Sequence, residues 1–597
     1  MTSAEAQAAL LFSIGPVQNF IATARKGQDL WFGSWLLSEL ARTAAETAQA
    51  KEAVLIMPAP TSLEGQGAVA NKVMARVAAK DAVAVANAVE RAARERLADI
   101  AKSLFDRIAD GADGKHLRRD TAEAQVADLP EIAWVVVDEV VGDWGETRRR
   151  AETALAARKS LRDFGPVTCG APVPKSGLDG QRESVIDEAA FPKANQNGRA
   201  ERLRQSFGVG PAERLCGVGL LKRKGRYALT AQQAHGARVI STAHVASWSL
   251  RRAWDGLTAA HEDLRAAFGG FVAALPDKGA SLSEVPQGYE DPALGRVDGL
   301  VLFAGRLSED YEGSQLVTAR RELSTFLSEA RRIVEERGGR WPVLSPYYAV
   351  VRADGDRMGK WLDGLSTPKD HQSASEALAG FAASAETVVA QHHGHCVFAG
   401  GDDVLALLPV ATALECAAAL NDAFTLAIAE GPKGSGSAPT LSVGVQIAHA
   451  TDPFRGSLEG AREAEHAAKH TYERAAFAVR LEKRSGAPVL VGGKWSDLPA
   501  FRALQNAQDP NVGSLPRGLA YDLWRVVERL AGEDSALNPI RALEVDRVLN
   551  QKDLGHHATS AVWARLGGRD LSYACLMRTC DELVVTRALA ALDREDV

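Results

Sequence analysis

Two glycines followed by two aspartates interrupt the apolar stretch HCVFAGGDDVLALLP at residues 395–409. Glycine and aspartate are common in hairpins, because glycine tolerates positive φ and aspartate caps turns with its own carboxylate. A plain turn would explain any one of Gly400, Gly401, Asp402 and Asp403. The four together, placed between two strand-like runs, indicate a hairpin whose tip carries two adjacent carboxylates.

A third aspartate, Asp354, directly follows the strand-like run YYAVVRA, 48 residues before Asp402. Three carboxylates that converge raise one another's pKa unless a cation neutralises them. Mg²⁺ is a natural partner, since it binds one or two protein carboxylates together with substrate phosphates. Glycines without a Cβ would let the backbone approach a triphosphate. This combination predicts two-metal nucleotidyl transfer, in which metal ions stabilise the charge that develops on the α-phosphate and the pyrophosphate.

The elements that must position these aspartates follow from the hydrophobic pattern. In the second half of the chain, the pattern predicts two strands, a hairpin and three helices, at 347–353 (strand), 371–391 (helix), 395–409 (hairpin), 411–429 (helix), 440–450 (strand) and 457–480 (helix). The order β-α-β-β-α-β is that of a ferredoxin-like palm. In such a palm the first strand and the hairpin are neighbours, so Asp354 can face the hairpin tip.

The first 140 residues also alternate strands and helices. Strands are expected at 9–15, 53–59 and 132–140, and helices at 17–48, with a break near Gly27, and at 68–108. The expected fold class is therefore α+β and multidomain, with two ferredoxin-like palms, a helical insert and a helical C-terminal domain. The domains are expected at 1–142 (first palm), 143–330 (insert), 331–496 (second palm with the catalytic hairpin) and 497–597 (C-terminal domain).

Composition narrows the class of protein. The 597 residues carry a net charge of −6, with 46% hydrophobic and 24% charged residues, which is typical of a folded protein without a general attraction to nucleic acid or anionic membranes. No apolar run of about 18 residues appears, and the N-terminus lacks a basic region ahead of its apolar run, so we expect a cytoplasmic protein without a membrane contact. The six cysteines form no C-x-x-C pair and are expected to be reduced.

Four segments together resemble a known family. ADGDRMGKWL, AGGDD, LSVGVQIAHATDPF and AREAEHAAKH, in this order, are similar to the catalytic palm of the large subunit of type III-B CRISPR-Cas effector complexes. The N-terminal segment GPVQNFIATARKGQDLWFGSWLLSEL resembles the first, non-catalytic palm of that subunit. The resemblance implies two facing palms that join two ATP molecules into cyclic oligoadenylates when the complex holds a target RNA. The implied partners are the other subunits, guide RNA and target RNA.

The resemblance also assigns metal and nucleotide residues. Asp354, Asp402 and Asp403 match the ligands of two Mg²⁺ or Mn²⁺ ions, with the Gly355 carbonyl as an addition. Gly400 and Gly401 would admit the nucleotide. Lys469 matches a lysine that contacts the triphosphate. Without the resemblance, it would be interpreted as an ordinary exposed lysine on a helix. Ser375 and Ser34 match serines near the adenines, although serine at a helix start is usually a cap.

Residues 15–18 open a helix just after a strand. Free N–H groups at such a turn can cradle a phosphate, and Gln18 is the candidate binding residue there, but the same residues equally suit a plain turn. Trp31 and Trp35, four apart on a helix, are more typical of a core than of a base-stacking platform.

The sequence departs from the family in two ways. Many members begin with an HD nuclease domain, but this chain contains no His-Asp dipeptide and starts its first palm strand within a dozen residues, so we expect no DNase activity from it. The family's insert usually holds zinc on paired C-x-x-C motifs. Here only Cys169 and Cys216 remain, and two cysteines alone make a poorly closed site, so zinc is not expected.

Three alternatives remain open. A stand-alone GGDEF-type cyclase would normally continue Glu-Phe, whereas Val404 follows Asp403 here. A template-reading polymerase would need a channel lined by basic residues, and the net negative charge of the chain gives little support for one. A scaffold subunit with a silent palm would hold the 5′ end of the guide RNA and the partner subunits, and this role is compatible with catalysis.

Overall fold

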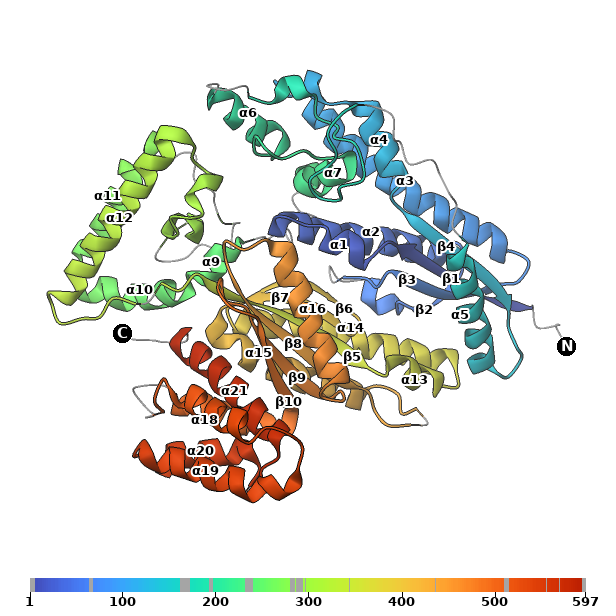
Figure 1. Ribbon diagram of the computed structural model, residues 1–597. Helices are drawn as coiled ribbons and strands as arrows, with labels where there is room; N and C mark the ends of the chain where they lie inside the picture. The colour runs from blue at the N-terminus through green and yellow to red at the C-terminus, as the bar shows by residue number, and fades with distance from the viewer. Residues whose placement is uncertain are drawn as a thin grey trace.

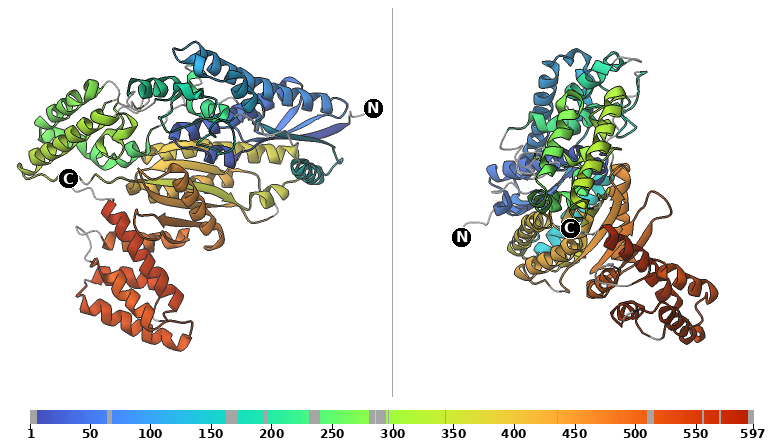
Figure 2. Two further views of the ribbon diagram at one scale, coloured as in Figure 1. Left: turned by 45° about the horizontal axis from the view of Figure 1, so that its top comes forward. Right: turned by 90° about the vertical axis from the view of Figure 1, so that its left-hand side faces the viewer.

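The computed structural model describes most of the chain. The described residues are 6–63, 68–161, 172–192, 197–230, 240–279, 285, 294–295, 297–342, 344–434, 436–508, 515–554, 556–568 and 570–592, without the side chains of residues 18, 19, 197, 198, 255, 277 and 592. Two β-sheets lie near the middle of the molecule, helices flank them, and the last helices form a separate body at one end (Figures 1 and 2). The α+β fold class expected from the sequence is confirmed.

The first sheet is antiparallel, with strand order β2-β3-β1-β4. Its strands are β1 (Gln7–Gly15), β2 (Val54–Met57), β3 (Lys72–Ala78) and β4 (Glu131–Asp138). β1 lies between β3 and β4, and its buried residues alternate toward the two faces of the sheet. One face packs against α2 (Gly27–Ala50) and α3 (Ala82–Ala109), and the other against α5 (Trp144–Ser160). The short helices α1 (Gln18–Ala22) and α4 (Arg119–Ala127) complete this palm.

The predicted helix at 68–108 is wrong over its first part. Residues 72–78 form β3, and the helix begins only at Ala82. Lys72–Ala78 pairs with the whole of β1 up to Ser13, so Val73, Ala75 and Val77 enter the core. This pairing outweighs the helical propensity of an alanine-rich segment, and it completes the β-α-β-β-α-β order of the first palm.

The second sheet contains a palm of the same topology with two added strands, in the order β10-β9-β8-β5-β7-β6. Its strands are β5 (Tyr347–Asp356), β6 (His395–Gly400), β7 (Asp403–Leu408), β8 (Thr440–His449), β9 (Ala476–Leu481) and β10 (Val489–Lys494). The helices are α13 (Met358–Asp363), α14 (Pro368–Gln391), α15 (Val410–Glu430) and α16 (Phe454–His470). α14 and α15 share a core with one face of the sheet, while α16 packs on β8, β5 and β9.

The predicted helix at 457–480 is also too long. α16 ends at His470, and the run AFAVRL forms β9, which pairs in parallel with β8. Between them, Glu473, Arg474 and Ala475 all have positive φ, so the helix cannot continue through this segment. Because β9 pairs on both sides, its side chains are buried and its pattern is continuous rather than alternating.

The two palms contact each other in a reciprocal manner. α14 of the second palm packs on β2 of the first, and α2 of the first palm packs on β6 of the second. α2 and α14 each follow the first strand of their own palm, and β2 and β6 are the equivalent second strands. This reciprocity gives the pair an approximate two-fold relationship, like that of an isologous dimer. Arg148 of α5 adds an ion pair to Asp363 of α13 across the same boundary.

The insert is divided between the palms. α6 (Asn197–Phe207) and α7 (Gly217–Lys224) share the core of the first palm, and lie beside α3 and α4 in Figure 1. The remaining helices share a core with β5, β8 and α16 of the second palm; they are α9 (Thr242–Ala246), α10 (Trp248–Ala260), α11 (Asp263–Ala274) and α12 (Gly313–Glu335).

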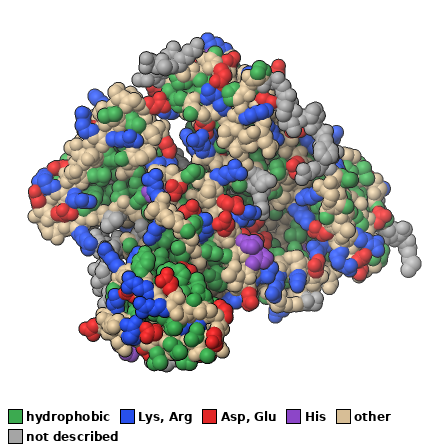
Figure 3. Space-filling view, viewed as in Figure 1, with side chains coloured by type: hydrophobic (Ala, Val, Ile, Leu, Met, Phe, Trp, Pro, Cys, Tyr) green, Lys and Arg blue, Asp and Glu red, His purple; other side chains and the backbone are tan. Residues whose placement is uncertain are grey.

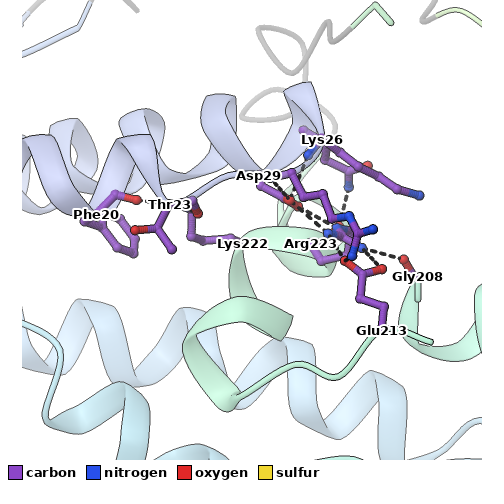
Figure 4. A network of polar contacts seen from close by, with 10 residues as sticks. Phe20, Thr23, Lys26, Asp29, Gly208, Glu213, Lys222 and Arg223 are labelled. Atoms are coloured by element: carbon purple, nitrogen blue, oxygen red, sulfur yellow. Dashed lines mark hydrogen bonds and ion pairs between the residues drawn. The ribbon is translucent and has the colours of Figure 1, made fainter. Parts of the chain in front are cut away.

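A buried ionic network attaches α7 to the first palm (Figure 4). The Arg223 guanidinium donates to Asp29 at 2.6 and 2.9 Å and to Glu213 at 2.9 and 3.0 Å. Burial raises the pKa of Asp29, but the charge and hydrogen bonds of Arg223 outweigh this effect and leave the pKa below its usual value. The neighbouring Lys222 donates to the carbonyls of Phe20 and Thr23.

The last helices form a separate core. They are α17 (Leu498–Ala507), α18 (Leu519–Arg529), α19 (Asn538–Gln551), α20 (His556–Leu566) and α21 (Tyr573–Leu592), and they project from the second palm in Figure 2. α17 and α21 join them to that palm, because both helices also contribute side chains to its core. No strand occurs among the described residues of 500–592, as expected. Charged side chains of both signs are interspersed over the face shown in Figure 3. α15 is long and apolar enough to cross a membrane, but it packs on α14, β8 and β5.

Removing the Arg223 charge should weaken the attachment of the insert. We expect Arg223→Met to cost about 3–5 kcal/mol, because Asp29 and Glu213 would remain buried without their partner. The matched control is Arg202→Met on the exposed face of α6, which should change stability by less than about 0.5 kcal/mol. Thermal and denaturant unfolding measure both variants, and equal effects of the two would contradict this account.

Candidate functional site

The hairpin tip between β6 and β7 has a conformation that depends on its glycines. Gly401 has a φ of +64°, a left-handed conformation that glycine adopts without strain. A Cβ at Gly400 would lie 2.6 Å from the Phe398 ring, and Gly400 pairs with Asp403 across the hairpin. The local structure therefore explains why glycine occupies both positions. The resulting turn carries Asp402 and Asp403 at its tip.

The C-terminal end of β5 touches this tip. A Cβ at Gly355 would lie 2.7 Å from Oδ2 and 2.8 Å from Cβ of Asp402, and the backbone N–H of Gly355 donates to the Asp402 carboxylate. Because β5 pairs with β7 up to Ala353, the next residue, Asp354, lies close enough to hydrogen bond with Asp403. The three aspartates predicted from the sequence thus converge at one edge of the second palm.

The convergence perturbs two of the carboxyls. Burial and the negative charge of Asp354 raise the pKa of Asp402 to about 6. Asp403 is open to solvent from one side, but the protein packed around it and the charges of Asp354 and Asp402 raise its pKa to about 8. Perturbed carboxyls of this kind are characteristic of functional sites, because the arrangement is unfavourable without a cation.

Lys469 supplies positive charge to this cluster. It reaches from the last turn of α16 and forms an ion pair with Asp354, and its Nζ lies 3.2 Å from Oε1 of Glu465. Burial lowers the pKa of Lys469, but the two carboxylates outweigh burial and raise it. The ammonium group therefore remains charged and partly neutralises the carboxylates.

The donor set suits a hard divalent cation, since it consists of carboxylate oxygens. In the positions observed, however, no set of three or more His, Cys, Asp or Glu side chains in the described residues is arranged as a metal site. The Lys469–Asp354 ion pair offers a physical reason, because it engages one of the three carboxylates. Metal binding at this cluster would require Lys469 to release Asp354.

A cavity of about 620 Å³ opens beside Asp403, between the two palms and the insert. The first palm contributes Pro16, Val17 and Phe20, and the insert contributes Arg182 and Lys222, among others. The second palm contributes residues of β5, β6, β7 and α16, namely Arg352, Phe398, Asp403, Val404, Leu405, Arg455, Leu458, Glu459 and Arg462. The volume lies in the range of small-molecule sites, and the position between domains is common for such sites.

Asp356 is close in sequence but has another role. Its buried carboxylate accepts hydrogen bonds from Thr440 at 2.7 Å, from Ser442 at 2.9 Å and from the backbone N–H of Ala475 at 3.0 Å. These contacts tie the end of β5 to β8 and to the positive-φ segment that follows α16. Asp356 therefore fixes the surroundings of the carboxylate cluster.

The other predicted nucleotide residues lie elsewhere. Ser34 is buried in α2, and Ser375 lies in α14, where its Oγ accepts a hydrogen bond from Ala59 N at 2.9 Å across the palm–palm contact. Neither residue lines the cavity. Gln18 begins α1, and its side chain is outside the described part. Their assignment to nucleotide binding stays a prediction.

The aromatic and cysteine predictions have different outcomes. Trp31 is buried in the first-palm core and stacks on Trp35, with ring centroids 6.1 Å apart, as expected for core residues.

Cys216 is buried at the start of α7, where its Sγ accepts a hydrogen bond from Gly219 N and lies 3.4 Å from Asp179 Oδ2. Cys169 lies outside the described residues, so the expectation about zinc stays a prediction.

Two residues at the site were not found from the sequence. Glu465 pairs with Lys469 and lies 3.5 Å from Arg352 Nε, and Arg352 also lines the cavity. The spacing in the sequence could have revealed both residues. Glu465 lies four residues before Lys469 on a helix, and Arg352 lies two residues before Asp354 on a strand. Each therefore shares a face of its element with a predicted site residue.

The described geometry defines a class of fold: two ferredoxin-like palms in reciprocal contact, one of which carries an acidic hairpin tip, as in nucleotide cyclases. Comparison with known proteins agrees. The family model described as Cas10/Cmr2, second palm domain, matches residues 347–478, and the model described as CRISPR-associated protein Cmr2, N-terminal, matches residues 9–102. Both palms of the chain are therefore similar to the Cmr2 proteins of CRISPR systems.

One curated relative is similar over part of the chain, and solved structures share its fold. The CRISPR system Cmr subunit Cmr2 of Pyrococcus furiosus is 30% identical over 210 residues, which are 30% of this chain and 24% of that protein. The type III-B Cmr-beta cryo-EM structure in its apo state has a similar fold (TM-score 0.63, 14% identity, 93% of this chain and 78% of that chain). The same is true of Cmr-beta bound to cognate target RNA (TM-score 0.59, 14% identity, 92% and 79%).

Metal binding at the carboxylate cluster should depend on pH. The raised pKa values mean that Asp402 and Asp403 hold protons at a pH where free aspartate does not, and a metal ion requires the deprotonated form. Binding should therefore release protons, and Mn²⁺ affinity should increase from pH about 6 to about 8, at most about tenfold per unit for each carboxyl. Calorimetric titration in buffers of different ionisation enthalpy measures both effects. An affinity that is flat over this range would contradict the account.

Lys469 should weaken the binding of metal ions and strengthen the binding of nucleotide. In Lys469→Met, Asp354 loses its cation, so we expect Mn²⁺ to bind more tightly and ATP more weakly, each by about tenfold. The matched control, Lys494→Met, removes a lysine that donates to the carbonyls of Glu473 and Arg474 near the same helix. Titrations with Mn²⁺ and with ATP measure both variants, and weaker Mn²⁺ binding in Lys469→Met would contradict this role.

Proposed function

We propose that this chain is an ATP nucleotidyltransferase that makes cyclic oligoadenylates as the large subunit of an RNA-guided antiviral effector complex. The observation that carries the proposal is the carboxylate cluster of Asp354, Asp402 and Asp403 at the mouth of a cavity between two palms. A palm with a decayed site would have no need to keep three carboxylates together, since the charge of Asp354 raises the pKa of Asp402 and of Asp403.

In this proposal the cluster and the cavity have separate tasks. Two Mg²⁺ or Mn²⁺ ions, when bound, would stabilise charge on the α-phosphate and the leaving pyrophosphate. Asp354, Asp402 and Asp403 would hold them, with the Gly355 carbonyl as a further ligand. Lys469 would transfer its ion pair from Asp354 to a substrate phosphate, which a flexible lysine side chain allows.

The substrate atoms are those of two ATP molecules. The 3′-hydroxyl of one ATP attacks the α-phosphorus of the other and loses its proton to water. A 3′-5′ phosphodiester forms, and pyrophosphate leaves with the electrons of the broken P–O bond. The first palm would hold one nucleotide at the helix start after β1, where Pro16 and Val17 line the cavity. Bringing both nucleotides together in one cavity supplies the proximity that the reaction needs.

The proposed partners follow from the family. Guide RNA, target RNA and the other subunits of a type III-B complex would surround this chain in the cytoplasm, and target RNA would switch synthesis on. Two palms on separate domains suit such a switch, because a small rotation at their contact misaligns the two halves of the cavity. The Arg148–Asp363 ion pair lies at this contact.

The test uses the assembled complex with labelled ATP, Mg²⁺ or Mn²⁺ and a matching target RNA. We expect cyclic and linear oligoadenylates, and we expect Asp402→Asn with Asp403→Asn to lower their formation by at least about a thousandfold, since the amides cannot hold the ions. The products are resolved by mass.

The matched control is Asp422→Asn, an exposed aspartate on α15, which packs on the opposite face of the sheet from α16. It should keep wild-type activity. Equal activity of the double variant and this control would contradict the proposed site. A wild-type complex that binds target RNA but makes no product under either metal would favour the scaffold role instead.

A further inference from the structure

Three basic residues are spaced seven apart along α16: Arg455, Arg462 and Lys469. Seven residues make almost two full helical turns, so the three side chains share one face, with successive Cα atoms about 10.5 Å apart along the axis. This basic stripe begins at the carboxylate cluster, where Lys469 pairs with Asp354. It ends about 21 Å away, at the first turn of the helix.

The same face of α16 forms a wall of the cavity. Arg455, Leu458, Glu459 and Arg462 all line it, at the i, i+3, i+4, i+7 positions of one helical face. Asp403 lines the cavity as well, so the space beside the stripe is continuous with the carboxylate cluster. Other residues that line the cavity are Arg182, Lys222 and Asp179 of the insert and Glu131 of the first palm.

The charges of the stripe are only partly compensated. Arg462 donates to Glu459 at 2.7 and 3.2 Å, and Lys469 pairs with Asp354 and Glu465. Arg455 is exposed, and among the described residues no hydrogen bond or ion pair compensates its charge. Its neighbour Glu459 accepts from Arg462 instead. A guanidinium on a cavity wall without a carboxylate partner is available to an anion.

We propose that the basic stripe of α16 binds the phosphodiester backbone of the growing oligoadenylate as it leaves the carboxylate cluster. The inference rests on the proposed function and names the ligand of this wall: a short single-stranded oligonucleotide with several negative charges. A stacked strand rises about 3.4 Å per nucleotide along its axis, and an extended strand rises more, so 21 Å corresponds to several nucleotides.

The stripe then determines product length. An intermediate held along α16 keeps its reactive end near the cluster for the next addition, whereas an intermediate that dissociates ends as a short product. Arginines suit this task, because a guanidinium makes charge-assisted hydrogen bonds with successive phosphate oxygens without reading the base.

The test compares the complex with Arg455→Ala, Arg462→Ala in the large subunit with the wild-type complex. We expect the ratio of longer products to dinucleotide to fall about tenfold or more, the size of effect that loss of charged phosphate contacts produces. Binding of a synthetic linear oligoadenylate with a 5′-triphosphate should weaken by a similar factor and lose part of its salt dependence. Arg331→Ala, an exposed arginine on α12, is the matched control and should change neither quantity.

The two measurements separate the two claims. A wild-type complex that makes no dinucleotide overturns the proposed function, while the binding measurement still decides whether the stripe holds an oligoadenylate. If the double variant binds the oligonucleotide as tightly as the Arg331→Ala control, or gives the same product lengths, the inference is wrong. Arg455→Lys with Arg462→Lys keeps the charges and should restore most of the binding.

Discussion

The mutual repulsion of three carboxylates is the constraint on which the site depends. Asp402 lies against Gly355, and Asp403 hydrogen bonds with Asp354, so burial and like charge raise the pKa values of Asp402 and Asp403 to about 6 and about 8. Such a cluster stores unfavourable electrostatic energy that a cation can release. Lys469 provides part of that relief. In the function proposed above, divalent ions bound together with a polyphosphate would provide the rest.

The rest of the fold holds this cluster against a second palm. Reciprocal contacts of α2 with β6 and of α14 with β2 place the two palms face to face. The insert adds to both halves, since α7 is locked to the first palm by the buried Arg223–Asp29 pair and α9 to α12 share a core with the second. The cavity lined by all three parts is therefore sensitive to their relative position.

The sequence predicted the second palm well, because its hairpin and its buried strands agree locally with the final fold. It failed where tertiary pairing decided the conformation. Residues 72–78 are rich in alanine and valine, and they become β3 because they pair with β1. In the same way, residues 476–481 become β9 because they pair with β8. The carboxylate cluster was predictable from the neighbouring strands of a palm. The cavity was not, since its insert wall comes from residues more than 150 positions away from the second palm's hairpin.

The most direct test of the account is to locate the metal ions. Anomalous diffraction from crystals of this subunit, grown with Mn²⁺ and a non-hydrolysable ATP analogue, gives their positions without relying on turnover. The account predicts anomalous peaks among the carboxylates of Asp354, Asp402 and Asp403, with Lys469 moved from Asp354 to a phosphate. Nucleotide bound in the cavity with no metal at these carboxylates, or with Lys469 still paired to Asp354, would contradict it.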